Sequence, residues 1–289
     1  MPPATPVNGT PPTLSVPERS ARGILLALGP ALLVCGAAVL LFGFLLPLPG
    51  YLALAAGLLA AWAAERAGAS AGLTRDLALI AAGQAIISTI SLEADISYAN
   101  MLLMGAVLSL AVAVPYLVSR YAYGERTIRF PWRTGVRWTP VQWGYLMFVT
   151  VAGWLILPFY FITSGVYRNW PAVTEWHEIA RLFVGVNAVG IWDELFFICT
   201  VFALLRRHFP DWLANLLQAI VFVSFLWELG YQSWGPLLTI PFALLQGYTF
   251  RLTKSLSYVI TVHLLFDLVV FLVIVYAHTG VPPIFLVAP

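Results

Sequence analysis

Nine apolar runs make up most of the chain, and the short segments between them carry most of its charges and turn residues. A helix needs ~20 mostly apolar residues to cross a bilayer, and a chain in lipid must satisfy its backbone hydrogen bonds internally. Several runs are shorter than a full crossing. The pattern predicts an all-α fold, a polytopic transmembrane helix bundle of about 8–9 helices. The runs lie at about 23–47, 51–64, 77–92, 98–118, 141–163, 181–205, 212–229, 235–250 and 255–277.

The composition agrees with a membrane protein and argues against a nucleic-acid partner. Of the 289 residues, 61% are hydrophobic and 10% are charged, and the mean hydropathy is +0.87. Soluble domains are only about half apolar and about one quarter charged. The net charge of +2 is too small to suggest nucleic-acid binding. We therefore expect membrane lipids around the chain and no nucleic acid.

The distribution of positive charge predicts the orientation of the helices. Alternating the nine helices from a cytoplasmic N-terminus leaves only Arg168 and Arg181 on the outer side. Because Lys and Arg in short loops concentrate on the cytoplasmic side, this topology is favoured. The residues placed inside are Arg19, Arg22, Arg66, Arg75, Arg120, Arg126, Arg129, Arg133, Arg137, Arg206, Arg207, Arg251 and Lys254.

Three regions follow from this organisation. Residues 1–22 contain six prolines and no apolar core, which predicts a disordered cytoplasmic tail. Residues 23–139 would form the first transmembrane helices and a basic inner loop. Residues 140–289 would form a second set of transmembrane helices, which holds most of the ionisable residues found within apolar runs.

Five ionisable residues lie within the apolar runs after residue 180: Asp193, Glu194, Glu228, His263 and Asp267. A charge at the centre of a membrane helix costs ~2.5–3.5 kcal/mol on the insertion scale, so such residues are candidates for a functional site. His263 and Asp267 are four residues apart and share one helix face. Glu228 falls nearer the outer surface, and only a tilted or broken helix would bring it level. Each acid alone is equally consistent with a protonated carboxyl bonded to a neighbouring helix.

A family resemblance rests on the segments "DELFFIC" and "GYTFRLTKSLSYVITVHLLFD". They resemble the CPBP family of intramembrane proteases, which includes Ras-converting CAAX endopeptidases and bacterial Abi proteins. The resemblance covers about residues 140–278, so the region 140–289 is interpreted as a CPBP-like core. The family's three motifs read Glu-Glu-x-x-x-Arg, Phe-x-x-x-His, and His-x-x-x-Asn or Asp.

The first motif is only partly present. Asp193 stands where the family has its catalytic Glu, and Glu194 matches the second Glu. Ile198 replaces the Arg. A shorter base at the first position matters, because a misplacement of ~1 Å can cost about a hundredfold in rate.

The second motif is degenerate and the third is intact. Ser224 and Glu228 occupy the places of the Phe and the His, whereas His263 and Asp267 fit the third motif without alteration. The resemblance implies hydrolysis of a peptide bond within the membrane, in a membrane-associated peptide or protein substrate. It also implies that the first two motifs activate water and that the third stabilises the oxyanion. All five ionisable residues are thus predicted catalytic residues, and bacterial relatives indicate a bacterial plasma membrane.

Four carboxylates around one imidazole also raise the question of a metal. Such a set would not all carry charge in a medium of low dielectric constant. A divalent cation such as zinc or manganese would relieve this, with Asp193, Glu228, His263 and Asp267 as ligands.

Three functions are consistent with these residues. The first is an intramembrane endopeptidase of the CPBP type. The second is a catalytically inactive family member that acts as a membrane binding or immunity partner, which the missing Arg and His favour. The third is a proton or cation transporter, for which acids near the midplane are apt. Transporters often show repeated halves, and this chain shows no such symmetry.

Overall fold

The computed structural model describes residues 21–281 and 283–288, and over these ranges it contains helices and no strands. The polytopic helical bundle is therefore confirmed, and each of the nine predicted runs corresponds to one continuous helix. The elements are α1 (Ala21–Ala38), η1 (Val39–Gly43), α2 (Pro47–Arg66), α3 (Leu73–Ile87), α4 (Tyr98–Leu117), η2 (Val118–Ala122), α5 (Pro140–Thr163), η3 (Val166–Asn169), α6 (Trp176–Asp193), η4 (Glu194–Phe202), α7 (Ala203–Leu205), α8 (Asp211–Leu229), α9 (Pro236–Thr253) and α10 (Leu256–Thr279).

Seven of these helices are long and apolar enough to cross a membrane. The exceptions are α3, which has 15 residues, and α9, whose apolar run is interrupted by Gln246 and Arg251. The chain is thus an integral, multi-pass membrane protein. The seven candidate spans are Ala21–Gly43, Pro47–Arg66, Tyr98–Ala122, Pro140–Thr163, Trp176–Leu205, Asp211–Leu229 and Leu256–Thr279.

Several helix boundaries differ from the prediction by two to five residues, and two of them are at the start of α3 and of α1. Helix α3 begins at Leu73 and not at residue 77, because Asp76 lies inside the helix and is paired with Arg207 and His208. Helix α1 begins at Ala21, two residues before the predicted span. The predicted tail up to residue 20 lies outside the described residues.

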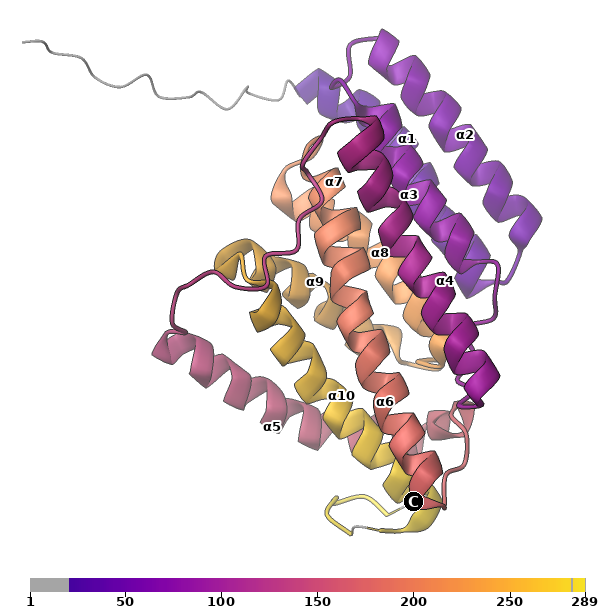
Figure 1. Cartoon of the computed structure of the whole chain (residues 1–289), viewed down its shortest axis with the longest axis vertical. Coiled ribbons are helices and arrows are strands. Elements are labelled where there is room, and N and C mark those ends of the chain that lie inside the picture. Colours follow the sequence, from indigo (N-terminus) through magenta and orange to yellow (C-terminus); the bar gives the residue numbers. More distant parts are fainter. Residues whose placement is uncertain (1–20, 282, 289) are drawn as a thin grey trace, which may run out of the picture.

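Helix α6, continued by η4 and α7, runs through the middle of the bundle (Figure 1). Helices α1 to α4 lie on one side of it, and α5, α9 and α10 lie on the other. The α6 span and α10 have the largest buried shares of the candidate spans, at 72% and 61%. These two helices carry four of the five predicted site residues, which places those residues in the protein interior and away from lipid.

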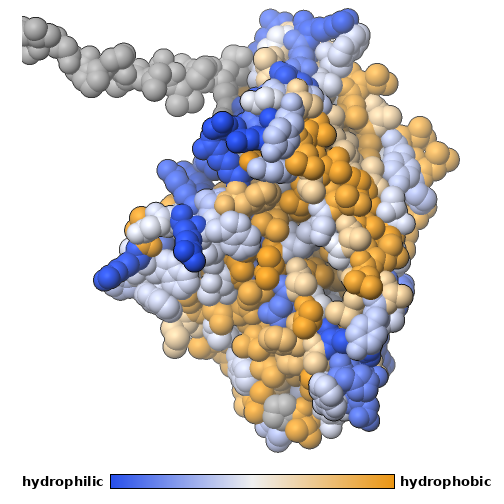
Figure 2. All heavy atoms as spheres, in the orientation of Figure 1, coloured by the Kyte–Doolittle hydropathy of each residue, from blue (hydrophilic) through white to orange (hydrophobic). Residues whose placement is uncertain are grey.

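The outer surface of the bundle is suited to lipid. Large apolar side chains are exposed on several helices, for example Leu59 of α2, Leu102 of α4 and Met147 of α5. In Figure 2, hydrophobic side chains cover the middle of the visible face. Hydrophilic side chains gather at the end where α1 begins and over the loop between η2 and α5.

Candidate active site

Asp193 and Glu194 lie at a change of helix type. Helix α6 ends at Asp193, and the π-helix η4 begins at Glu194. π-Helical segments are rare and occur frequently at functional sites. Both carboxyl groups are buried, with residue exposures of 1% for Asp193 and 0% for Glu194. Two adjacent acids are thus held inside the protein by the most buried span.

Helix α10 supplies His263 and Asp267 from one face, one turn apart. Gly190 of α6 allows the two helices to approach closely. A methyl group on Gly190 would overlap with Asp267 Oδ2 and would lie 3.3 Å from His263 Cδ2. A glycine is therefore required where α6 meets the third-motif residues.

His263 joins the acids of both helices into one group, here named the central cluster: Asp193, Glu194, His263 and Asp267. His263 Nδ1 lies 2.8 Å from Glu194 Oε1, which is a hydrogen bond. His263 Nε2 lies 3.6 Å from Asp193 Oδ2 and 3.8 Å from Asp267 Oδ1. These two distances are too long for direct hydrogen bonds and suit a bridging water.

Three carboxylate oxygens of the central cluster are buried without a hydrogen-bond partner among the described residues. They are Asp193 Oδ1, Glu194 Oε2 and Asp267 Oδ2. More than nine in ten buried polar groups in proteins have a partner, so three exceptions in one cluster need an explanation. Unfilled acceptors of this kind are suited to binding water or a polar group of a substrate.

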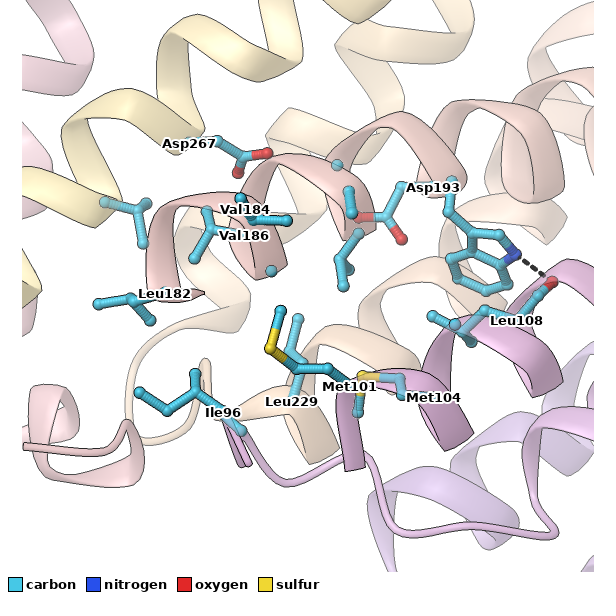
Figure 3. Close-up of a pocket in the computed structure, with 18 of the residues that line it drawn as sticks. Ile96, Met101, Met104, Leu108, Leu182, Val184, Val186, Asp193, Leu229 and Asp267 are labelled. Carbon is cyan, nitrogen blue, oxygen red and sulfur yellow. Dashed lines mark hydrogen bonds between the residues drawn. The ribbon is translucent and has the colours of Figure 1, made fainter. Parts of the chain in front are cut away.

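Two apolar cavities meet at the central cluster. The first, of about 320 Å³, lies between α4 and α6 and contacts Asp193, and the second, of about 300 Å³, lies between α5, α9 and α10. Figure 3 shows Asp193 and Asp267 on one side of the first cavity, across from Met101 and Met104 of α4. The residues that line both cavities are Leu226, Tyr231, His263, Asp267 and Val270.

The structure does not bring Glu228 into the central cluster. Its Oε1 accepts a hydrogen bond of 3.0 Å from Leu92 N, and its side chain lines a separate polar cavity with Glu93 and Arg168. Glu228 lies at the last turn of α8, and no tilt or break of that helix brings it level with His263. Glu228 therefore lies outside the central cluster, contrary to the prediction.

The residues of α8 that face the central cluster are Phe222 and Leu226. The Phe222 ring lies 6.1 Å from the His263 ring, and Leu226 lines both cavities. Their spacing of four residues is that of the family's Phe-x-x-x-His motif. This spacing makes Leu226, two residues before Glu228, the residue of α8 whose position in the structure agrees with the motif His.

The residues as placed do not fit a metal ion. Across residues 21–281 and 283–288, no group of three or more His, Cys, Asp or Glu side chains has a suitable arrangement. One of the four predicted ligands, Glu228, lies in another cavity. The chemistry proposed below therefore uses the side chains alone.

Two polar residues near the central cluster were missed by the sequence analysis. Gln246 of α9 donates from Nε2 to Glu194 Oε1 at 2.6 Å. Tyr231, after α8, lines both cavities together with His263 and Asp267. Burial and the nearby carboxylates of Asp267 and Asp193 raise the pKa of Tyr231 far above its ordinary value, so its hydroxyl keeps its proton. A neutral polar residue inside an apolar run was the available signal for Gln246.

Comparison with known proteins agrees with the motif-based resemblance. Residues 175–269 match the family model described as type II CAAX prenyl endopeptidase Rce1-like. No curated protein and no solved structure matches the chain significantly. The matched segment runs from the start of α6 into α10 and includes the whole central cluster. Over this segment the chain is similar to the type II CAAX prenyl endopeptidases, in agreement with the resemblance to the CPBP family, and its first and second motifs depart from the family pattern.

Proposed function

We propose that the protein is an intramembrane endopeptidase of the CPBP type, which hydrolyses a peptide bond in a membrane-associated peptide or protein. The observation that carries this proposal is the position of His263 Nε2, 3.6 Å from Asp193 and 3.8 Å from Asp267. His263 and Asp267 line both apolar cavities and Asp193 lines the first, so a water bound beside His263 Nε2 would be within reach of both carboxylates. The family match of residues 175–269 supports the same chemistry.

Asp193 is the proposed general base. An ionised carboxylate only accepts hydrogen bonds, so His263 Nδ1 donates to Glu194 and Nε2 presents its lone pair to the water beside it. This water would give its proton to Asp193 while its oxygen attacks the carbonyl carbon. General-base assistance of this kind contributes about a hundredfold to ten thousandfold in rate.

The proton taken from water then has a short route to the leaving amine. Asp193 Oδ2 and His263 Nε2 lie close enough to share it through one water, and either group can deliver it. Tyr231, which borders both cavities, is the proposed hydrogen-bond donor to the developing oxyanion. Glu194 takes no part in proton transfer and orients the imidazole ring.

Cleavage of a peptide library by the purified protein in nanodiscs tests this function. Mass spectrometry of the new termini identifies the cleaved bond. The wild type should produce discrete products, and His263→Ala should produce none above background. His278→Ala serves as the matched control, because His278 bonds the carbonyl of Ile274 within its own helix and packs against the Tyr167 ring, away from the central cluster.

The inactive-partner function is favoured by one specific observation. Leu226 and Ile198 are apolar residues at the positions where the family has its motif His and Arg. If folded wild-type protein cleaves no member of the library, this alternative replaces the protease. Photo-crosslinking from Met104 in the first cavity would then capture a bound membrane partner.

For the orientation, we propose a cytoplasmic N-terminus in the plasma membrane of a bacterium. The excess of Lys and Arg in the predicted inner loops and the resemblance to bacterial Abi proteins support this. Reporter fusions at Gly124 and Ala288 should report opposite sides of the membrane. The same side for both would refute the alternation of nine helices.

A further inference from the structure

Gln246 is a fully buried amide in the otherwise apolar stretch "PFALLQGYTF" of α9. Its Nε2 donates to Glu194 Oε1 at 2.6 Å and to the carbonyl oxygen of Val259 at 3.2 Å. A carboxylate and a carbonyl oxygen only accept hydrogen bonds, so both contacts fix which end of the amide faces them. The side chain thereby connects η4, α9 and α10 beside the central cluster.

Glu194 Oε1 accepts two hydrogen bonds, one from Gln246 Nε2 and one from His263 Nδ1. The carboxylate is therefore held from one side by the amide and from the other by the imidazole. A carboxylate with a single partner is free to rotate about its last bond, whereas two donors on one oxygen define its position. The orientation of His263 depends on that position, because Nδ1 has no other acceptor among its described contacts.

Ile198 explains why an amide is needed here. The first motif of the family places an Arg four residues after its second Glu, within hydrogen-bonding reach on the same helix. In this chain that position is Ile198, which is fully buried in the apolar core. A neutral amide from a different helix donates to Glu194 in its place.

We propose that Gln246 is a positioning residue that takes over the role of the missing motif arginine. It holds Glu194, and through Glu194 it fixes His263 with Nδ1 protonated and Nε2 directed at Asp193 and Asp267. The effect on catalysis rests on the proposed protease function, but the effect on His263 does not. Two readouts are therefore needed.

The first readout is the tautomer of His263, measured by nitrogen NMR on protein labelled at histidine. The described histidines are His177, His208, His263 and His278, and the His263→Ala variant assigns the relevant signals. The wild type should show the Nδ1-protonated form of His263. Gln246→Leu and Gln246→Met both remove the donor, and the second keeps the length of the side chain. Both should shift His263 to a mixture of tautomers.

His208 provides an internal control for the fold. Its ring is held by Ser70 and Asp76, which have no contact with Gln246 among the described interactions. Its signals should be the same in all variants. Gln246→Arg, which restores a donor to Glu194, should keep the wild-type tautomer of His263.

The second readout is peptide cleavage. Gln246→Leu and Gln246→Met should lower kcat by ten- to a hundredfold with KM within twofold, because a misplacement of ~1 Å costs about a hundredfold. Gln246→Arg should recover at least part of kcat. If the tautomer and kcat are unchanged in both donor-free variants, Gln246 is not a positioning residue. If the tautomer changes but even the wild type cleaves nothing, the positioning role stands and the protease function fails.

Discussion

The molecule holds two buried groups in which a histidine meets carboxylates, and they differ in how fully they are paired. The central cluster lies between α6 and α10. The second group, here named the terminal network, joins the start of α3 to the segment after α7, at the end of the bundle where α1 begins (Figure 1). It consists of Ser70, Asp76, Glu125, Arg207 and His208.

Every side-chain oxygen of Asp76 has a partner. Oδ1 lies 2.9 Å from Arg207 Nη1, and Oδ2 lies 2.6 Å from His208 Nε2. His208 Nδ1 is in turn 2.6 Å from the Ser70 hydroxyl. Burial alone would lower the pKa of Arg207, but its bonds to Glu125 and Asp76 raise the pKa above its ordinary value. In the terminal network each carboxylate oxygen of Asp76 and Glu125 therefore has a hydrogen-bond or ion-pair partner.

The central cluster has the opposite character. It has three carboxylates, one imidazole and no Arg or Lys among its described members, and three of its oxygens have no partner. Burying an unpaired polar group costs about 1–3 kcal/mol, so the arrangement does not serve stability. The comparison indicates that the same residue types stabilise the fold where they are matched and are available for chemistry where they are not. The two aspartates, Asp76 and Asp193, are 1% exposed in each case and allow a matched test.

The largest effect is expected for Asp193→Asn. Replacing the proposed general base with an isosteric amide should lower kcat about a thousandfold, since the amide accepts no proton. The melting temperature should stay the same or rise, because one of three crowded acids is removed. Peptide cleavage and thermal unfolding in the same detergent measure both. A fall in the melting temperature with unchanged cleavage would reverse the assignment of the two groups.

Asp76→Asn should show the converse behaviour. The amide cannot match both Arg207 and His208, and breaking a buried ion pair from one side costs about 3–5 kcal/mol. The free energy of unfolding should fall by about this amount, while cleavage per folded molecule stays within twofold. The fraction folded is measured by size-exclusion chromatography after a heat step. Loss of activity without loss of stability would show that the terminal network communicates with the site.

The two groups also differ in what the sequence could predict. The helices could be predicted because apolar runs of suitable length end at charges and turn residues. Each of the nine predicted runs corresponds to a helix of the structure. His263 and Asp267 were paired correctly by helix periodicity, since a spacing of four is a local property. The prediction that they lie close to Asp193 came from the family resemblance, because no local rule of sequence spacing determines how α6 packs against α10.

Three features could not be obtained in this way. The predicted helix began at residue 77 and so left out Asp76, because the partners of Asp76, Arg207 and His208, are more than a hundred residues away in the sequence. Glu228 was placed in the site because it is the only acid of α8 near the second-motif position, although the helix turns Leu226 toward His263 instead. Gln246 is uncharged, so it is not among the ionisable residues that mark the apolar runs, and its position inside an apolar run was its only signal in the sequence. Each depends on which helix faces meet, which is a tertiary property.

Leu226→His should increase activity, because it restores the second-motif histidine at the position that lines both cavities. General acid–base assistance is worth about a hundredfold or more when well placed, so a gain of about tenfold is expected for an unoptimised side chain. The matched control is Leu229→His, about one turn away on α8, because Leu229 lines the first cavity and the polar cavity of Glu228 but not the second cavity. A gain for Leu229→His and none for Leu226→His would refute the revised position of the motif.

Glu228→Gln should leave cleavage within twofold. The side chain bonds Leu92 N in a separate polar cavity, and the amide keeps an oxygen to accept that hydrogen bond. The measurement is kcat and KM on the best library peptide, with Asp193→Asn measured alongside. A loss approaching that of Asp193→Asn would place Glu228 in the catalytic machinery and support the assignment made from the sequence.

The smallest effect is expected for metal chelation. The central cluster has the oxygens that a divalent cation prefers, but its described side chains do not form a set of three ligands at suitable positions. If carboxylates alone activate water, the purified protein should retain cleavage within twofold after treatment with EDTA or phenanthroline. Elemental analysis should find less than one zinc or manganese per chain. A different result would show that a cation binds the unpaired oxygens. In that case chelation would abolish the activity of the wild type, zinc or manganese would restore it, and neither metal would restore activity to Asp267→Asn. With the metal bound, the carboxylates of the central cluster would have a positive partner, as those of the terminal network do. The two groups would then differ only in that partner, which would be a metal ion in one and the Arg207 side chain in the other.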